Sequence, residues 1–209
     1  MKVVAILQAR MKSTRLPGKV MLPLAGRPML EHIYNRVKRA TKVDRVIVAI
    51  PKGSWNAMRD AYIPFNDFFL FDGDENDLVA RYLACAMLHQ ADLIVRIPCD
   101  NPCVEPEYID EAVERYLIHC TPFLSNTTVV REEGYFVDGL GAEVLSISRL
   151  KWLDHITAGK ATLREHPHKW FNLEGYGLIP KADLRLDVNT QADYEFIHGI
   201  YEALYPTNP

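Results

Sequence analysis

The chain has 209 residues, 48% hydrophobic and 24% charged, which suits one well-filled α/β domain and is too short for two comfortable ones. Its formal net charge of -3 provides no basic field for nucleic acid or an anionic membrane. The N-terminal apolar run stops at Leu7, and no stretch approaches the roughly 20 apolar residues that cross a bilayer. We therefore expect a cytoplasmic protein with neither nucleic-acid nor membrane partners.

Short apolar runs alternate with helical stretches through the first 121 residues. Met29, Leu30, Ile33 and Val37 recur at helical spacing after Pro28, which can open a helix at its first turn. The strands that this alternation predicts cover residues 3–7, 45–50, 68–71 and 93–97. This order predicts an α/β fold with a doubly wound, mostly parallel, Rossmann-like sheet, which binds ligands at the carboxyl ends of its strands.

The regular alternation stops at residue 122. We expect a small inserted α+β subdomain over 122–182, used for acceptor binding or dimerisation, with the nucleotide-binding core formed by 1–121 and 183–209. The strands predicted beyond residue 121 cover 123–126, 143–147 and 184–188, and Ser148 is the expected cap of a short helix. Thr190 and Asp193 have the spacing of a capping box and predict the start of the last helix.

The loop after the first strand carries four cations within ten residues: Arg10, Lys12, Arg15 and Lys19. Ser13, Thr14 and Gly18 allow backbone amides to approach a phosphate, and arginine forks match phosphate oxygens. A triphosphate is the simplest polyanion that satisfies this loop. A solvated basic loop is the alternative, but the clustering and the stiffening Pro17-Gly18 pair argue against it.

Two other nucleotide motifs are absent or incomplete. No G-x-x-x-x-G-K-[ST] sequence is present, which disfavours a P-loop ATPase. Gly139-x-Gly141 lacks the third glycine of a dinucleotide fingerprint and precedes a predicted strand instead of following one.

The run from Ala9 to Lys19 (ARMKSTRLPGK) resembles the A-R-x-x-S-T-R-L-P-G-K signature of the cytidylyltransferase family. That family includes CMP-Kdo synthetases, acylneuraminate cytidylyltransferases and the spore-coat polysaccharide synthesis protein F group, to which the sequence is most similar. Further matches fall at 77–82, 96–106, 139–144, 164–166 and 185–195.

The resemblance implies a fold like that of nucleotide-diphospho-sugar transferases. It also implies Mg²⁺-dependent transfer of CMP from CTP to a sugar acid, or to a phosphorylated or phosphonate acceptor, with release of pyrophosphate. Surface polysaccharide biosynthesis is the expected pathway, and a homodimer is the expected assembly.

The resemblance also assigns site residues. Those implied to bind the nucleotide are Leu7, Gln8, Ala9, Arg10, Ser13, Thr14, Arg15, Lys19 and Arg81. Those implied to contact the acceptor are Glu143, Arg164 and His166, and the catalytic set is Arg15, Lys19 and Asp100.

The implied Mg²⁺ ligands are Asp100, Asp187 and Asn189. Asp100 follows a predicted strand directly, and a carboxylate at a strand's carboxyl end suits a hard, oxygen-seeking cation. Asn189 occupies the position of a family carboxylate and brings a carbonyl oxygen without a charge.

Three alternative functions stay open. Another nucleoside triphosphate could replace CTP, because base choice rests largely on backbone contacts. A glycosyltransferase could use Asp72-x-Asp74 as its metal motif, although the basic loop would then be unexplained. A non-catalytic nucleotide-binding protein is the third alternative, and Asn189 is the feature that keeps it open.

Overall fold

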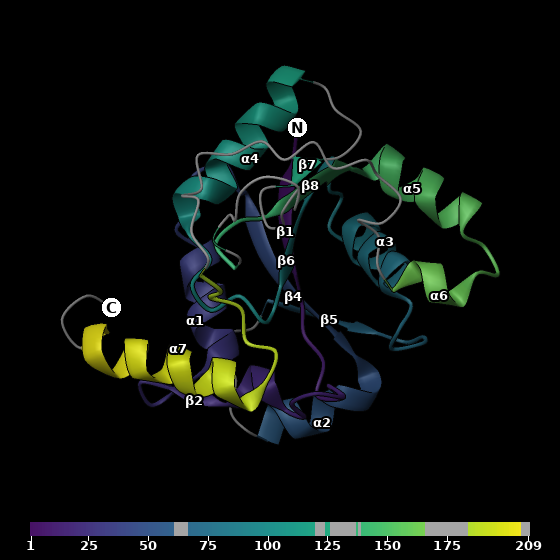
Figure 1. The fold of residues 1–209 in the computed structure, drawn as a ribbon. Helices are drawn as coiled ribbons and strands as arrows, with labels where there is room; N and C mark the ends of the chain where they lie inside the picture. The colour runs from purple at the N-terminus through teal and green to yellow at the C-terminus, as the bar shows by residue number, and fades with distance from the viewer. Residues whose placement is uncertain (61–66, 120–123, 126–136, 138, 166–183, 206–209) are drawn as a thin grey trace.

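The computed structural model describes residues 1–60, 67–119, 124–125, 137, 139–165 and 184–205 (Figure 1). Its main sheet has six strands in the order β5-β4-β1-β6-β8-β7. These are β1 (Val3–Gln8), β4 (Arg45–Pro51), β5 (Phe68–Phe71), β6 (Leu93–Pro98), β7 (Leu124–Ser125) and β8 (Glu143–Ser146). The first four in sheet order are parallel, and β8 runs antiparallel to both β6 and β7. The predicted mostly parallel, doubly wound α/β fold is confirmed.

Helices cover both faces of this sheet (Figure 1). One face carries α1 (Met29–Val37), α4 (Pro106–His119) and α7 (Gln191–Leu204), and the other carries α3 (Leu78–Leu88), α5 (Ile147–Ile156) and α6 (Ala161–Arg164). Helix α2 (Lys52–Asp60) connects β4 to β5, while η1 (Lys19–Met21) and the ribbon of β2 (Pro23–Leu24) and β3 (Arg27–Pro28) follow the basic loop.

The alternation of side chains along β1 supplies both hydrophobic cores. Val3, Ala5 and Leu7 belong to the core beneath α1, α4 and α7. Val4 and Ile6 belong to the core beneath α3 and α5. All five side chains are at most 5% exposed, as expected for a central parallel strand that is covered on both sides. Gln8, next in the second series, therefore lies on the α3 side at the carboxyl end of the strand.

The helix caps agree with the sequence in one case and correct it in another. Thr190 and Asp193 form the predicted capping box of α7, with both reciprocal hydrogen bonds present. Helix α5 is capped by Ser146, whose hydroxyl accepts from the Arg149 amide at 3.3 Å, so the prediction of Ser148 is wrong. The reason is that β8 ends at Ser146 and passes directly into the helix, which leaves no intervening turn.

The predicted strand at 184–188 is also wrong. Only an isolated bridge at Arg185 is present there, and no strand of the described residues pairs with the segment. Instead the Val188 amide donates to the Asp100 carbonyl oxygen at 2.7 Å, which fixes the segment beside the loop that follows β6.

The predicted insertion is described only in part. Its strand β8 pairs with β6 through residues 143–146, so this portion extends the main sheet. The expected strand at 123–126 is described only at β7, and the boundaries 122–182 stay a prediction. Among the described residues, no helix is long and apolar enough to cross a membrane.

Candidate active site

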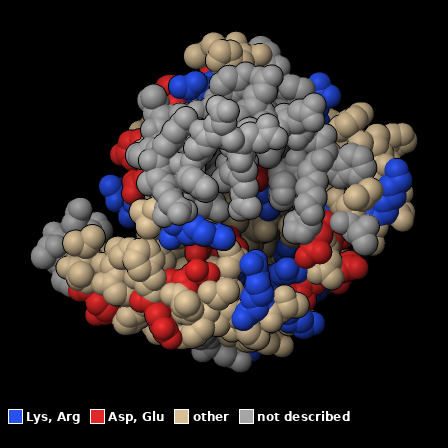
Figure 2. All heavy atoms as spheres, in the orientation of Figure 1, with Lys and Arg blue, Asp and Glu red and all other residues tan. Residues whose placement is uncertain are grey.

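A cavity of about 280 Å³ lies at the carboxyl ends of β1 and β6. Figure 2 shows Lys and Arg side chains gathered with carboxylates around the hollow in this face. The predicted site residues that line it are Gln8, Arg10, Ser13, Thr14, Arg15, Lys19, Arg81, Asp100, Glu143 and Asp187. The structure therefore brings the basic loop and the acidic strand ends together, as their positions in the sequence predict.

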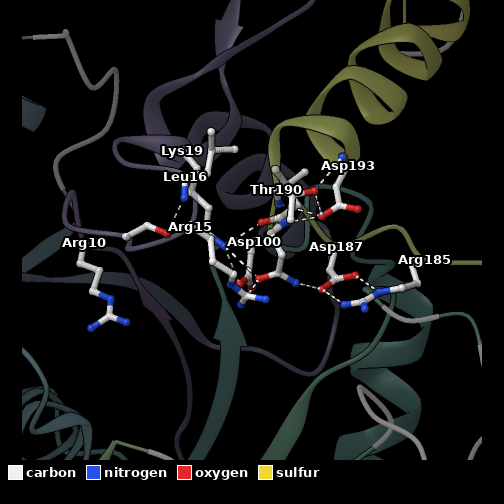
Figure 3. Close-up of polar contacts among 12 residues, drawn as sticks. Arg10, Arg15, Leu16, Lys19, Asp100, Arg185, Asp187, Thr190 and Asp193 are labelled. Carbon is white, nitrogen blue, oxygen red and sulfur yellow. Dashed lines mark hydrogen bonds and ion pairs between the residues drawn. The ribbon is translucent and has the colours of Figure 1, made fainter.

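The basic loop is held closed by its own backbone. The carbonyl oxygen of Met11 accepts from the Gly18 amide at 2.8 Å and from the Ser13 amide at 3.2 Å. Gly18 has φ +71°, a left-handed conformation that costs glycine little. This closure ends the loop at η1 and directs Arg15 and Lys19 towards the strand ends (Figure 3).

The ammonium group of Lys19 links three distant segments. It donates to Asp100 Oδ2 at 3.0 Å, to the Val188 carbonyl oxygen at 2.7 Å and to Asn189 Oδ1 at 3.4 Å. The side chain is only 12% exposed, so these contacts are weakly screened. Arg15 reaches the same Asn189 oxygen through Nη2 at 2.6 Å.

Asp187 is engaged on both carboxylate oxygens. Arg185 donates Nε to Oδ1 at 3.0 Å and Nη2 to Oδ2 at 2.8 Å. The side-chain Nδ2 of Asn189 donates to Oδ2 as well. The segment is held close by Gly139, which has φ +93°. A Cβ at position 139 would lie 2.8 Å from both the Asp187 amide nitrogen and the Leu186 carbonyl carbon.

Replacing Gly139 with alanine is therefore expected to cost roughly 2 to 4 kcal/mol, because backbone strain is added to a clash with backbone atoms that cannot rotate away. Gly159→Ala is the matched control, since Gly159 has φ +73° but nothing within 4 Å of its added Cβ. It should cost only about 1 kcal/mol. Urea unfolding of both variants checks the difference, and equal losses would show that the approach to Asp187 imposes no constraint.

The oxygen atoms of the three predicted metal ligands fit a divalent cation in part. Mg²⁺ in phosphate-transfer sites is usually bound by one or two carboxylates together with substrate phosphates. Asp100 fits that role, because it lines the cavity and uses Oδ2 for Lys19. Asp187 already has hydrogen-bond donors on both oxygens, and among the described residues no group of three or more His, Cys, Asp or Glu side chains is gathered as for a metal. The metal roles of all three residues stay predictions.

A buried polar network forms the other side of the cavity. Arg96 forms an ion pair with Glu143, and the two side chains are 8% and 4% exposed. Gln8 Oε1 accepts from Arg96 Nε at 3.1 Å and from the Tyr82 hydroxyl at 2.8 Å. Burial raises the pKa of Tyr82, so its hydroxyl stays protonated and acts as the donor. The sequence analysis did not single out Arg96, although a lone arginine within the apolar strand LIVRIP is a usable signal.

Arg81 lines the cavity although only 1% of it is exposed. Burial lowers the pKa of its guanidinium. Its Nε and Nη1 have no hydrogen-bond partner among the described residues, and Nη2 makes only a 3.5 Å contact with the Glu75 carbonyl oxygen. Buried donors of this kind normally find a partner, and an anionic or carbonyl-rich ligand would supply one.

Three predicted nucleotide-binding residues lie differently. Arg10 donates Nη1 to Asn76 Oδ1 at 2.8 Å and contacts Glu165 at 3.3 Å, and it lies apart from the Lys19 cluster (Figure 3). Leu7 and Ala9 are fully buried, and the Ala9 amide donates to the Ala49 carbonyl oxygen. A ligand could contact Leu7 and Ala9 only through backbone atoms that are not already hydrogen-bonded.

Arg164 lines a second hollow and not the cavity. Its Nε donates to Asp77 Oδ2 at 2.8 Å and its Nη2 to Asp154 Oδ1 at 2.6 Å, so its guanidinium joins the start of α3 to α5. The adjacent Glu165 lines the main cavity instead, a contact that the sequence analysis missed. His166 lies outside the described residues.

A doubly wound sheet with a cationic loop and carboxylates gathered around one cavity is the arrangement expected of a nucleotidyltransferase. The family model described as "Cytidylyltransferase" matches residues 4–197, and the chain belongs to this family. The chain is 28% identical to the Bacillus subtilis spore coat polysaccharide biosynthesis protein SpsF, over 96% of this chain and 86% of that protein.

Two further comparisons agree. A 3-deoxy-manno-octulosonate cytidylyltransferase from Trichlorobacter lovleyi is 35% identical over 56% of this chain and 46% of its own length. The solved structure of a cytidylyltransferase from Leptospira borgpetersenii superposes with a TM-score of 0.83 at 28% identity, covering 98% of this chain and 88% of that one.

Proposed function

We propose that this chain transfers CMP from CTP to a small acceptor and releases pyrophosphate, in the presence of Mg²⁺. The observation that carries the proposal is the position of Lys19, which joins the basic loop to Asp100, beyond β6, and to residues 188–189, before α7. Arg15 and Arg81 line the same cavity. These three cations around one cavity suit a polyphosphate. Membership of the cytidylyltransferase family supports CTP as the nucleotide.

In this proposal the chain acts by positioning and by neutralising charge. An acceptor oxygen attacks the α-phosphorus in line, a bond forms between them, and the bond to the pyrophosphate oxygen breaks. Arg15 and Lys19 stabilise the negative charge of the departing pyrophosphate, for which Lys19 exchanges its contact with Asp100 for a phosphate oxygen. Mg²⁺, held by Asp100, supplies further charge neutralisation when bound.

The acceptor is proposed to be a sugar acid, or a phosphorylated or phosphonate compound. The names of the SpsF and octulosonate relatives support that class and a place in surface polysaccharide biosynthesis. Glu143 is proposed to face the acceptor because it lines the cavity beside Arg96. Arg164 would have to break its contacts with Asp77 and Asp154 before it could bind the acceptor. A cytoplasmic location and a homodimer formed through residues 122–182 rest on the sequence.

The test is pyrophosphate release from CTP, GTP, ATP and UTP with Mg²⁺, against a panel of sugar acids and phosphorylated or phosphonate acceptors. Acceptor-dependent release with CTP alone is the expected result. Release with a different nucleotide would overturn the choice of CTP, and CTP binding without release across a broad panel would argue for a non-catalytic role.

The glycosyltransferase alternative is not favoured. Asp72 is paired with Lys52 at 2.6 Å and its side chain is 79% exposed. Neither Asp72 nor Asp74 lines the cavity.

A further inference from the structure

The side-chain amide of Asn189 is oriented by partners at both ends. Its Oδ1 accepts from Arg15 Nη2 at 2.6 Å and from Lys19 Nζ at 3.4 Å. Its Nδ2 donates to Asp187 Oδ2. An asparagine side chain can accept and donate at once, whereas an ionised aspartate can only accept. Asn189 therefore accepts from two cations and donates to a carboxylate, and an ionised aspartate in its place could not make the second contact.

The contacts of Asn189 complete a chain of alternating polar groups. Arg185 donates to Asp187 (Figure 3). Asp187 accepts from Asn189, and Asn189 accepts from Arg15 and Lys19. The Asp187 side chain is only 9% exposed, yet its charge is balanced by Arg185. No divalent cation is needed to hold this arrangement together.

An aspartate at position 189 would change that balance. Its carboxylate would meet the Asp187 carboxylate at hydrogen-bond distance, where the two negative charges repel each other unless a cation lies between them. Paired carboxylates at that separation are a normal site for Mg²⁺.

We propose that Asn189 is a positioning residue that orients Arg15 and Lys19 for a phosphate chain without a divalent ion. The divalent ion then enters with the nucleotide, on Asp100. This inference rests on the proposed function for the identity of the nucleotide. Its own content is that the protein without nucleotide binds polyphosphate in the absence of metal and does not bind Mg²⁺ alone.

The test uses the full chain, inorganic tripolyphosphate and MgCl₂, with neither CTP nor an acceptor. For the wild type we expect tripolyphosphate binding in EDTA by calorimetry. We also expect no saturable rise in Tm with MgCl₂ when ionic strength is matched. For Asn189→Asp we expect a saturable rise in Tm with MgCl₂ and a loss of tripolyphosphate affinity in EDTA of about tenfold or more, because one negative charge is added beside the phosphate.

Two further variants separate the causes. The double variant Asp187→Asn/Asn189→Asp has the same number of carboxylates as the wild type, so MgCl₂ should not raise its Tm. Asn189→Ala keeps the backbone amide that donates to Asp193 at 3.0 Å, and it should lose tripolyphosphate affinity without gaining a response to MgCl₂. If Asn189→Asp fails to fold, these two variants and the wild type still decide the question.

A saturable Mg²⁺ response in the wild type would overturn the inference, as would wild-type tripolyphosphate affinity in Asn189→Ala. Because no measurement involves CTP or an acceptor, failure of the proposed reaction leaves these results readable. The reverse also holds, since pyrophosphate release from CTP does not decide what the empty site binds.

Discussion

Replacing Lys19 with alanine is expected to lower kcat by about 10²- to 10³-fold, the range found when one preorganised electrostatic group is removed from an active site. The Lys19 ammonium is the shared contact of Asp100, Val188 and Asn189, and it is the cation that we place on the departing pyrophosphate. Because its role is strongest in the transition state, kcat should fall more than KM rises. Steady-state pyrophosphate release measures both quantities.

Lys12→Ala is the matched control for this prediction. Lys12 belongs to the same loop, but its side chain is 78% exposed and contacts Glu75 at 3.5 Å, and it does not line the cavity. Its removal should change kcat less than about threefold, since an exposed pair contributes little. Wild-type turnover in Lys19→Ala, or equal losses in both variants, would contradict the assignment. Thermal unfolding shows whether either variant has lost its fold.

The second large effect is expected on stability. Arg96→Met should lower the free energy of unfolding by roughly 3 to 5 kcal/mol, because it leaves the Glu143 carboxylate buried without its cation. Glu143 is 4% exposed and Arg96 is 8% exposed, so water has little access to the carboxylate. The variant also removes a donor to Gln8. We expect Tm to fall by roughly 10 °C for a chain of this length.

Two comparisons identify the buried charge as the cause. The double variant Arg96→Met/Glu143→Gln should recover much of the loss, since the buried side chain at 143 is then neutral. Arg27→Met breaks the Arg27–Glu31 pair, in which Arg27 is 52% exposed, and should cost less than about 1 kcal/mol. A double variant as unstable as Arg96→Met would mean that packing of the arginine, and not its charge, dominates.

The parts of the fold that follow from local pattern were predictable. The apolar strand ending at Leu7 and the cations behind it lie close together in the sequence, so their place at a strand end could be read directly. The capping box of Thr190 and Asp193 is equally local, because both partners lie within one helical turn. Asp100 follows the same rule, since it stands two residues beyond β6.

The remaining features depend on partners that are distant in the sequence. Arg96 sits in the sheet because the antiparallel register of β8 places Glu143 opposite it, and nothing near Arg96 predicts that register. The resemblance assigns Arg164 to the acceptor because it matches a family position there, but its contacts with Asp77 and Asp154 depend on how α3 and α5 pack. The segment at 184–188 has the composition of a strand, yet it lies beside the loop after β6 and joins neither sheet of the described residues.

The three-way contact of Lys19 has a consequence for the protein during its synthesis. Lys19 meets Asp100 across 81 residues and Asn189 across 170. A nascent chain therefore displays the basic loop long before the ribosome has released the groups that hold it in place. Nucleotide bound in the native manner cannot guide early folding, and an immobilised nucleotide should not retain nascent chains that stop before residue 189.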